Sequence, residues 1–225
     1  VFKGFMRLGG EPIGDDPQLV PPDIVGQSDW LPAVELYGEG LFMTLDEDRL
    51  KIWEQASAVK NRLAAMRARF EGSGPKDPAT FSPRFVLLHT LAHLLMREIE
   101  SEGGYPAASL SEALYCAVHP KPMMGMLIYV AVPDIAGSLG GLAELAEPRR
   151  FLGILTRALE HARWCSLDPV CSEHEGQGPG LLNRSACHAC ALVPDSACAH
   201  GNTLLDRGVV KGDTDSGLPA FFEMP

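Results

Sequence analysis

The feature that most constrains this chain is a group of cysteines near its C-terminal end. The group consists of Cys165, Cys171, Cys187, Cys190 and Cys198. A sixth cysteine, Cys116, stands apart from the others. The first residues show no signal-peptide pattern, so we expect the clustered cysteines to bind a metal rather than to form disulfides.

The spacing of Cys187 and Cys190, with two residues between them, is typical of a zinc knuckle. A turn of this length directs both sulfurs at one ion, about 2.3 Å away. We expect Cys198 as the third ligand and Cys171 as the fourth, with Cys165 as the alternative to Cys171. Four thiolates complete a tetrahedron, so the zinc would be structural, and the alternative is a set of thiols without metal. Further candidate ligands in this window are His174, His188 and His200.

Composition and net charge limit the size of the domain and the partners that this chain can bind. The chain has 225 residues, 46% of them hydrophobic and 21% charged, which suffices for one large domain or a domain with a small appendage. Its net charge of −10 disfavours binding of nucleic acid or of an anionic membrane by the whole surface. The apolar stretches are too short for a membrane span. We therefore expect a cytoplasmic protein.

The pattern of apolar and loop-forming residues predicts an α+β fold, with helices packed on a small sheet. Expected parts are an extended arm or linker at 1–33, an α+β core at 34–164, a zinc-stapled, loop-rich subdomain at 165–210 and a loose tail at 211–225. Within the core, apolar residues three and four positions apart indicate helices, and a continuous apolar run indicates a strand covered on both faces. The predicted elements are helices over 46–70, 82–100, 109–116 and 148–164, a bent strand or hairpin over 34–45 and a strand over 124–132.

Two histidines lie one helical turn apart in the predicted central helix. His89 and His93 belong to a polar stripe with Arg97, and their spacing suits a metal site or two imidazoles over a groove that contacts DNA or a partner. No Glu follows His89 directly, so the zinc-protease pattern fails. The alternative, which we favour, is a pair of hydrogen-bonded histidines that pack the helix against the following strand.

Three further features are candidate contacts with DNA or a partner. The loop at 134–141, with Asp134 and Ser138, offers amides for a phosphate at a helix start, although a tight structural turn is the favoured interpretation. It lacks the lysine of a P-loop, so this chain carries no nucleotide-binding motif. Glu39 belongs to an acidic segment that we expect to be a solvated hairpin. In the arm, Trp30 is the expected aromatic anchor for a partner.

Taken in order, several segments resemble a known family. They are residues 35–42, 85–93, 104–105, 134–141, 165–171, 186–190 and 202–207. This set resembles the C-terminal part of the DrmB family of DISARM anti-phage defence systems, and the wider MrfA-type zinc-binding domain at the C-termini of some DNA helicases. His188 stands where the helicase-borne versions have a proline between the paired cysteines, and the upstream ligand is displaced.

The resemblance implies a non-catalytic, zinc-binding accessory part of a bacterial helicase complex in antiviral defence. Its expected partners are a DrmA-like DNA helicase subunit and, through the complex, DNA, with no membrane. The alternative is a metal-dependent nuclease or hydrolase that uses the face of His89 and His93.

Overall fold

The computed structural model describes residues 29–33, 38–73, 81–118, 120–131 and 140–222. The chain divides into two units at Tyr37 and Gly38. Of the first unit, residues 29–33 are described, and they contain neither helix nor strand. All of the elements below belong to the second unit.

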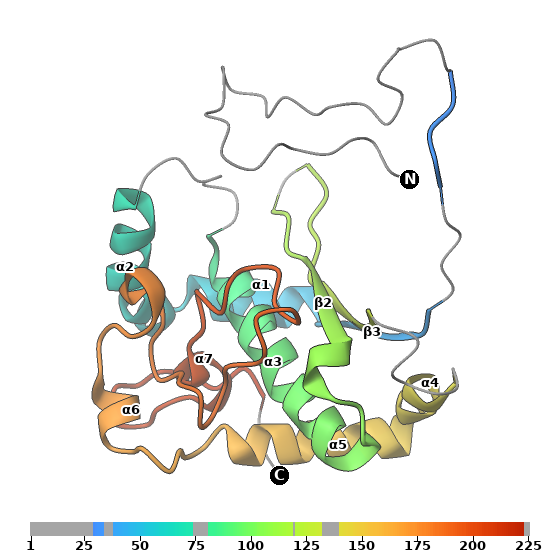
Figure 1. The fold of residues 1–225 in the computed structure, drawn as a ribbon. Helices are drawn as coiled ribbons and strands as arrows, with labels where there is room; N and C mark the ends of the chain where they lie inside the picture. The colour runs from blue at the N-terminus through green and yellow to red at the C-terminus, as the bar shows by residue number, and fades with distance from the viewer. Residues whose placement is uncertain (1–28, 34–37, 74–80, 119, 132–139, 223–225) are drawn as a thin grey trace. The chain divides into compact units, whose positions relative to one another are not determined.

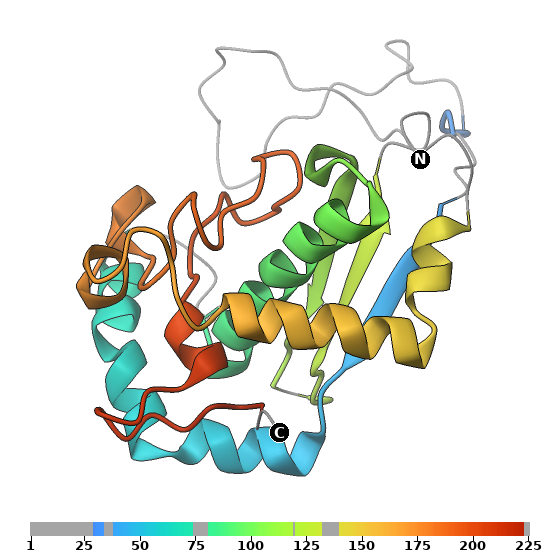
Figure 2. The ribbon, with the colours of Figure 1, turned by 90° about the horizontal axis from the view of Figure 1, so that it is seen from below.

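A three-stranded antiparallel sheet forms one layer of this unit (Figures 1 and 2). Strand β1 (Gly40–Thr44) and strand β2 (Leu110–Tyr115) both pair with the central strand β3 (Gly125–Val130). On β3, Met126 and Ile128 are fully buried, whereas Leu127 and Tyr129 are half-buried. The apolar run is therefore covered on one face and only partly on the other, rather than on both faces as expected.

Helix α3 (Pro83–Gly103) packs on the covered face of the sheet and is buried almost all round. Its start follows the predicted signals, because the Ser82 hydroxyl accepts a hydrogen bond from the Phe85 amide and Pro83 occupies the first turn. It ends at Gly104, whose left-handed φ of 69° favours glycine. Helix α5 (Pro148–His161) packs against α3 and crosses it at an angle in Figure 2.

The remaining helices are shorter or lie at the edge. Their bounds are α1 (Glu47–Gln55), α2 (Ser57–Gly72), α4 (Gly141–Leu145), α6 (Val170–Glu173) and α7 (Arg207–Lys211), with two 3₁₀ turns, η2 (Ala107–Ser109) and η4 (Pro179–Leu181). The described part of the chain thus carries seven α-helices on one small sheet, which confirms the α+β prediction. None of these helices is both long enough and apolar enough to cross a bilayer.

Two of the predicted helices differ from the structure. The segment 109–116 forms strand β2 instead of a helix, because its side chains alternate between the core and the outside and its backbone pairs with β3. The segment 46–70 is two helices, since Ala56 takes extended backbone angles between α1 and α2.

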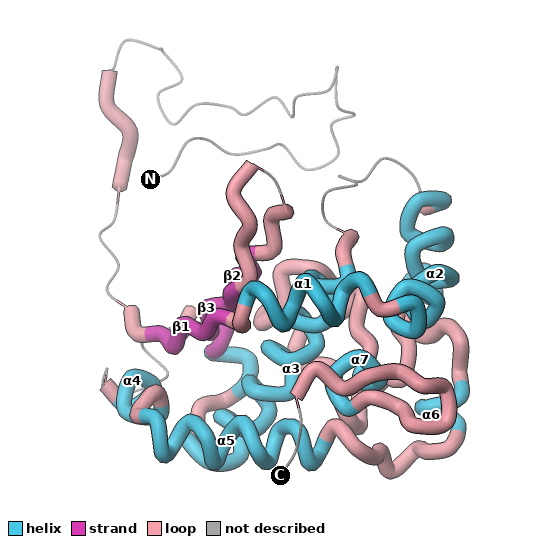
Figure 3. Tube along the Cα trace, turned by 180° about the vertical axis from the view of Figure 1, so that it is seen from behind, coloured by secondary structure: helices cyan, strands magenta, loops and turns pink. Residues whose placement is uncertain are grey.

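The cysteine-rich region shares the main core with α3. Leu182, Val193 and Leu204 are buried in the same apolar cluster as the central helix. Figure 3 shows that this region consists largely of loops around the short helices α6 and α7. The described part of the expected loose tail, residues 211–222, also packs on the core, because Phe221 is buried edge-on against Trp53.

Candidate metal centre

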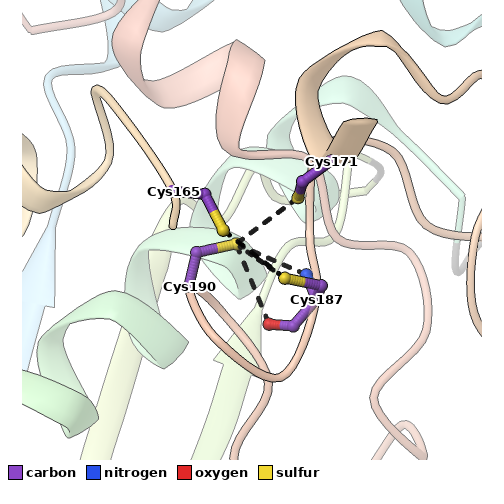
Figure 4. A group of neighbouring side chains, drawn as sticks. All are labelled: Cys165, Cys171, Cys187 and Cys190. Atoms are coloured by element: carbon purple, nitrogen blue, oxygen red, sulfur yellow. Dashed lines mark hydrogen bonds between the residues drawn. The ribbon is translucent and has the colours of Figure 1, made fainter. Parts of the chain in front are cut away.

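Four of the five clustered cysteines meet in one place. Figure 4 shows the sulfurs of Cys165, Cys171, Cys187 and Cys190 turned toward one another, and all four lie within 4.8 Å of each other. The measured Sγ–Sγ distances are 3.6 Å for Cys165 and Cys187, 3.7 Å for Cys187 and Cys190, and 3.8 Å for Cys171 and Cys190. Sulfurs placed about 2.3 Å from one ion at the corners of a tetrahedron lie about 3.8 Å apart. The group therefore has the dimensions of a four-thiolate zinc site.

Backbone amides near these sulfurs favour their thiolate form, which binds a metal cation. In the knuckle, the Cys190 amide donates to the Cys187 carbonyl at 3.1 Å, and the Cys187 amide points at the Cys190 sulfur at 3.4 Å. The Leu167 amide likewise donates to the Cys165 sulfur at 3.4 Å. Amide donors of this kind stabilise the negative charge of a thiolate.

Burial and the neighbouring sulfurs favour the protonated form of two of the thiols. Burial first, and then the charge of the nearby cysteines, raises the pKa of Cys171 to about 11 and also raises the pKa of Cys190. For Cys187, burial raises the pKa, but the Ala189 amide and the neighbouring sulfurs outweigh it, so the net shift is downward. A zinc ion must displace protons from this group, so its affinity falls as the pH falls.

An ion pair between Arg207 and Asp168 supports the part of the group that contains Cys165 and Cys171. Arg207, which is fully buried, donates to both carboxylate oxygens of Asp168 at 2.9 and 3.0 Å. Asp168 in turn accepts the Cys165 amide at 2.7 Å, which shapes the turn between Cys165 and Cys171. Burial raises the pKa of Asp168, but its bonds to Arg207 and to the Cys165 amide hold that pKa below its ordinary value.

The polar stripe of α3 supports the part of the group that contains Cys187 and Cys190. Arg97 donates to the carbonyls of Ala189 and Leu192, both at 3.0 Å. The ring of His93 lies with Nδ1 2.9 Å from the Ala191 carbonyl oxygen. The polar stripe of α3 therefore contacts the backbone of the knuckle, in line with the favoured interpretation that these side chains have a packing role.

Cys198 does not join the four-cysteine group, although the sequence favoured it as the third ligand. Asn202 closes the loop behind it, because its side chain bonds both the amide and the carbonyl of Val193 at 3.0 and 2.9 Å. This loop turns Cys198 toward α3, where its sulfur lies 3.3 Å from His89 Nε2. Both Cys165 and Cys171 take places in the group, so the choice between them does not arise.

His89 and His93 are fully buried, so neither imidazole is available to DNA or to a partner in this structure. They face Glu112, which belongs to the segment 109–116 that the sequence predicted as a helix and did not connect with them. Burial lowers the pKa of His89 to about 4, against the opposing pull of Glu112. Burial raises the pKa of Glu112, but the two imidazoles outweigh it and bring the value down to about 2.

The expected contacts in the 134–141 loop, Asp134 and Ser138, lie outside the described residues. At the end of this loop, the carboxylate of Glu39 accepts the amides of Gly140, Leu142 and Ala143 at 2.7, 3.0 and 3.2 Å. Of the described residues at the start of α4, these three amides are therefore already bonded to Glu39 and are not free for a phosphate. Glu39 acts as a capping residue, and residues 34–37 of the expected hairpin lie outside the described residues.

Comparison with known proteins agrees with the four-cysteine geometry. Residues 91–191 match the family model of the MrfA Zn-binding domain, and this range contains all four cysteines of the group. The expected resemblance is confirmed. The chain is also 34% identical over 230 residues to the DISARM protein DrmB of Bacillus paralicheniformis, an alignment that covers 99% of this chain. The chain spans 40% of the length of that curated relative.

The zinc-binding domain match and the four-sulfur geometry together support a structural zinc ion as the cofactor. Cys165, Cys171 and Cys190 are buried and Cys187 is half-buried, and their four sulfurs would fill every position of a tetrahedral ion and leave none open for a substrate. A zinc ion held in this way ties the ends of otherwise loop-rich segments together.

Proposed function

We propose that this chain is the zinc-stapled part of a DrmB-like component of DISARM anti-phage defence. The observation that carries the proposal is the identity to DrmB, which runs through nearly the whole chain and includes the zinc-binding domain match. In this proposal Cys165, Cys171, Cys187 and Cys190 hold the zinc ion. Its role is to keep a loop-rich surface rigid rather than to catalyse a reaction.

The finer part of the proposal is that the chain docks in the cytoplasm on a DrmA-like DNA helicase subunit and helps to engage DNA. A net charge of −10 supports an indirect role, because the chain alone repels a polyanion and needs basic surface supplied by the partner. Trp30 has 66% of its surface exposed, which suits an aromatic anchor at an interface.

A hydrolase that uses His89 and His93 is not supported by their environment. Metal-assisted hydrolysis needs an open coordination position that a substrate can reach. Both imidazoles and the Glu112 side chain between them are fully buried. We therefore favour an accessory, non-catalytic role.

The docking proposal is tested by co-purification with a DrmA-like DNA helicase subunit. Trp30→Ala should weaken recovery of the complex by about 10-fold or more, the scale of an aromatic hot spot. Phe42→Ala is the matched control, because Phe42 is also an exposed aromatic, 59% exposed, but lies on β1. Its recovery should equal that of the wild type, and both variants should keep their zinc. Undiminished recovery after deletion of residues 1–33 would contradict the docking proposal.

A further inference from the structure

A second group of metal-ligating side chains lies apart from the four cysteines. It consists of His89 and His93 on α3, Glu112 on β2 and Cys198 on the C-terminal loop, and their ligand atoms all lie within 4.8 Å of one another. We infer that these four residues form a second, structural site for a divalent transition metal of the zinc type. This inference does not depend on the proposed role in defence.

The distances within the group suit one shared ion. His89 Nε2 lies 3.0 Å from Glu112 Oε1 and 3.3 Å from Cys198 Sγ, and His93 Nε2 lies 3.5 Å from the same carboxylate oxygen. Nitrogen, oxygen and sulfur ligands about 2.0–2.3 Å from a tetrahedral ion lie roughly 3.2–3.7 Å apart. The contacts of 3.3 and 3.5 Å fall within this range and the contact of 3.0 Å lies just below it, so the atoms are spaced like neighbouring corners of one coordination sphere.

Hydrogen bonding accounts for the contact between His89 Nε2 and Cys198 Sγ but not for the contacts of Glu112. Both carboxylate oxygens of Glu112 and the Nε2 atom of His93 are buried without a hydrogen-bond partner. Among the described residues, the ion pairs of Glu112 are with the two imidazoles. A buried carboxylate without hydrogen-bond donors is costly, because it has lost its hydrogen bonds to water. A metal ion at the point where these atoms converge removes that cost.

The position of the proton on the His93 ring also supports a metal ion at this point. Its Nδ1 atom lies 2.9 Å from the Ala191 carbonyl oxygen, which can only accept, so the proton belongs on Nδ1. Nε2 then carries a lone pair directed at Glu112, and two acceptors face each other 3.5 Å apart. A carbonyl behind a ligating histidine is the usual arrangement that orients such a ring toward a metal.

Cys198 has the surroundings of a metal-bound thiolate. Its sulfur accepts the amides of His200 and Asn202, both at 3.3 Å. The first of these repeats the bond from the amide two residues ahead that Cys165 makes in the four-cysteine group. Cys116, by contrast, belongs to neither group.

The ligand set suggests both the metal and its role. Two imidazoles, one carboxylate and one thiolate form a mixed set that suits zinc, whose preferred ligands include all three types. All four come from the protein and are buried, so no position remains for a substrate. The ion would join α3, the sheet and the C-terminal loop. His89 and Cys198 lie outside residues 91–191, so the zinc-binding domain match does not account for this group.

The test is metal content of the 225-residue chain, purified from zinc-supplemented medium without chelator and measured by mass spectrometry. The wild type should hold about two zinc ions per chain. Cys198→Ser and Glu112→Gln should each hold about one, and Cys190→Ser should lose the other ion. Cys116→Ser is the matched control and should keep both.

Zinc X-ray absorption of the wild type keeps the inference testable if a variant fails to fold. With both sites filled, sulfur makes up about five of every eight ligands, and nitrogen or oxygen the rest. With the four-cysteine site alone, every ligand is sulfur. One zinc per chain with sulfur ligands only, or two ions that persist in Cys198→Ser, would overturn the second site and leave the first one intact.

Discussion

The ion pair behind the four-cysteine group gives the sharpest quantitative prediction. Asp168→Asn removes the charge that faces Arg207, a residue with no exposed surface. It also leaves one acceptor oxygen where two now serve the guanidinium, at 2.9 and 3.0 Å, and the Cys165 amide, at 2.7 Å. The buried guanidinium cannot recover these bonds from water.

Breaking a buried ion pair by removing one partner costs about 3–5 kcal/mol. The Asp168 side chain is 23% exposed, so water screens part of the pair, and Asn keeps one hydrogen bond. We therefore expect the free energy of unfolding of the zinc-loaded chain to fall by about 2–3 kcal/mol. Because Asp168 orients the turn that presents Cys165, zinc affinity should also fall by about 10-fold or more.

The assay is urea unfolding at neutral pH with free zinc held constant, followed by circular dichroism. Glu144→Gln is the control, because it breaks an ion pair with Arg150 whose side chains are 71% and 59% exposed. That change should stay within about 0.5 kcal/mol of the wild type. If Asp168→Asn were equally mild, the pair would not support the zinc group and the reasoning would be wrong.

Two further predictions concern α4 and DNA. Burial raises the pKa of Glu39, but Tyr105 and the α4 amides hold it below its ordinary value, so its contribution is present above about pH 4.5 and lost as the pH falls through the folded value. Glu39→Gln should therefore lower the free energy of unfolding by about 1 kcal/mol at pH 6–7, and this difference from the wild type should shrink below about pH 4. Separately, the isolated chain should bind duplex DNA weakly at physiological salt in a fluorescence anisotropy titration, because its net charge is −10. Tight, salt-sensitive binding by the chain alone would contradict that expectation.

The sequence predicted the central helix and the knuckle well, because both depend on local signals. Ser82 and Pro83 mark the start of α3, and the spacing of Cys187 and Cys190 specifies a turn around one ion. The upstream cysteines that complete the group are determined by the path of the chain through α5 and α6 to the knuckle. Loop length favoured Cys171 over Cys165, but the folded chain brings both to the same point.

Glu112 and Cys198 show where local reasoning failed. The pair Ser109 and Glu112 has the spacing of a helix cap, but long-range pairing with β3 makes the segment a strand. The alternation of Leu110 and Glu112 on one face of that strand was the available signal, and it places a carboxylate opposite α3. Cys198 is adjacent to the knuckle in sequence, yet its loop turns it to His89.

The central claim is that Cys165, Cys171, Cys187 and Cys190 surround one zinc ion. A crystal of the purified chain, with anomalous diffraction data collected on both sides of the zinc absorption edge, tests it most directly. We expect a zinc peak about 2.3 Å from each of the four sulfurs. A disulfide between any two of them with no peak at their centre, or a peak that has Cys198 in place of Cys165 or Cys171, would contradict it.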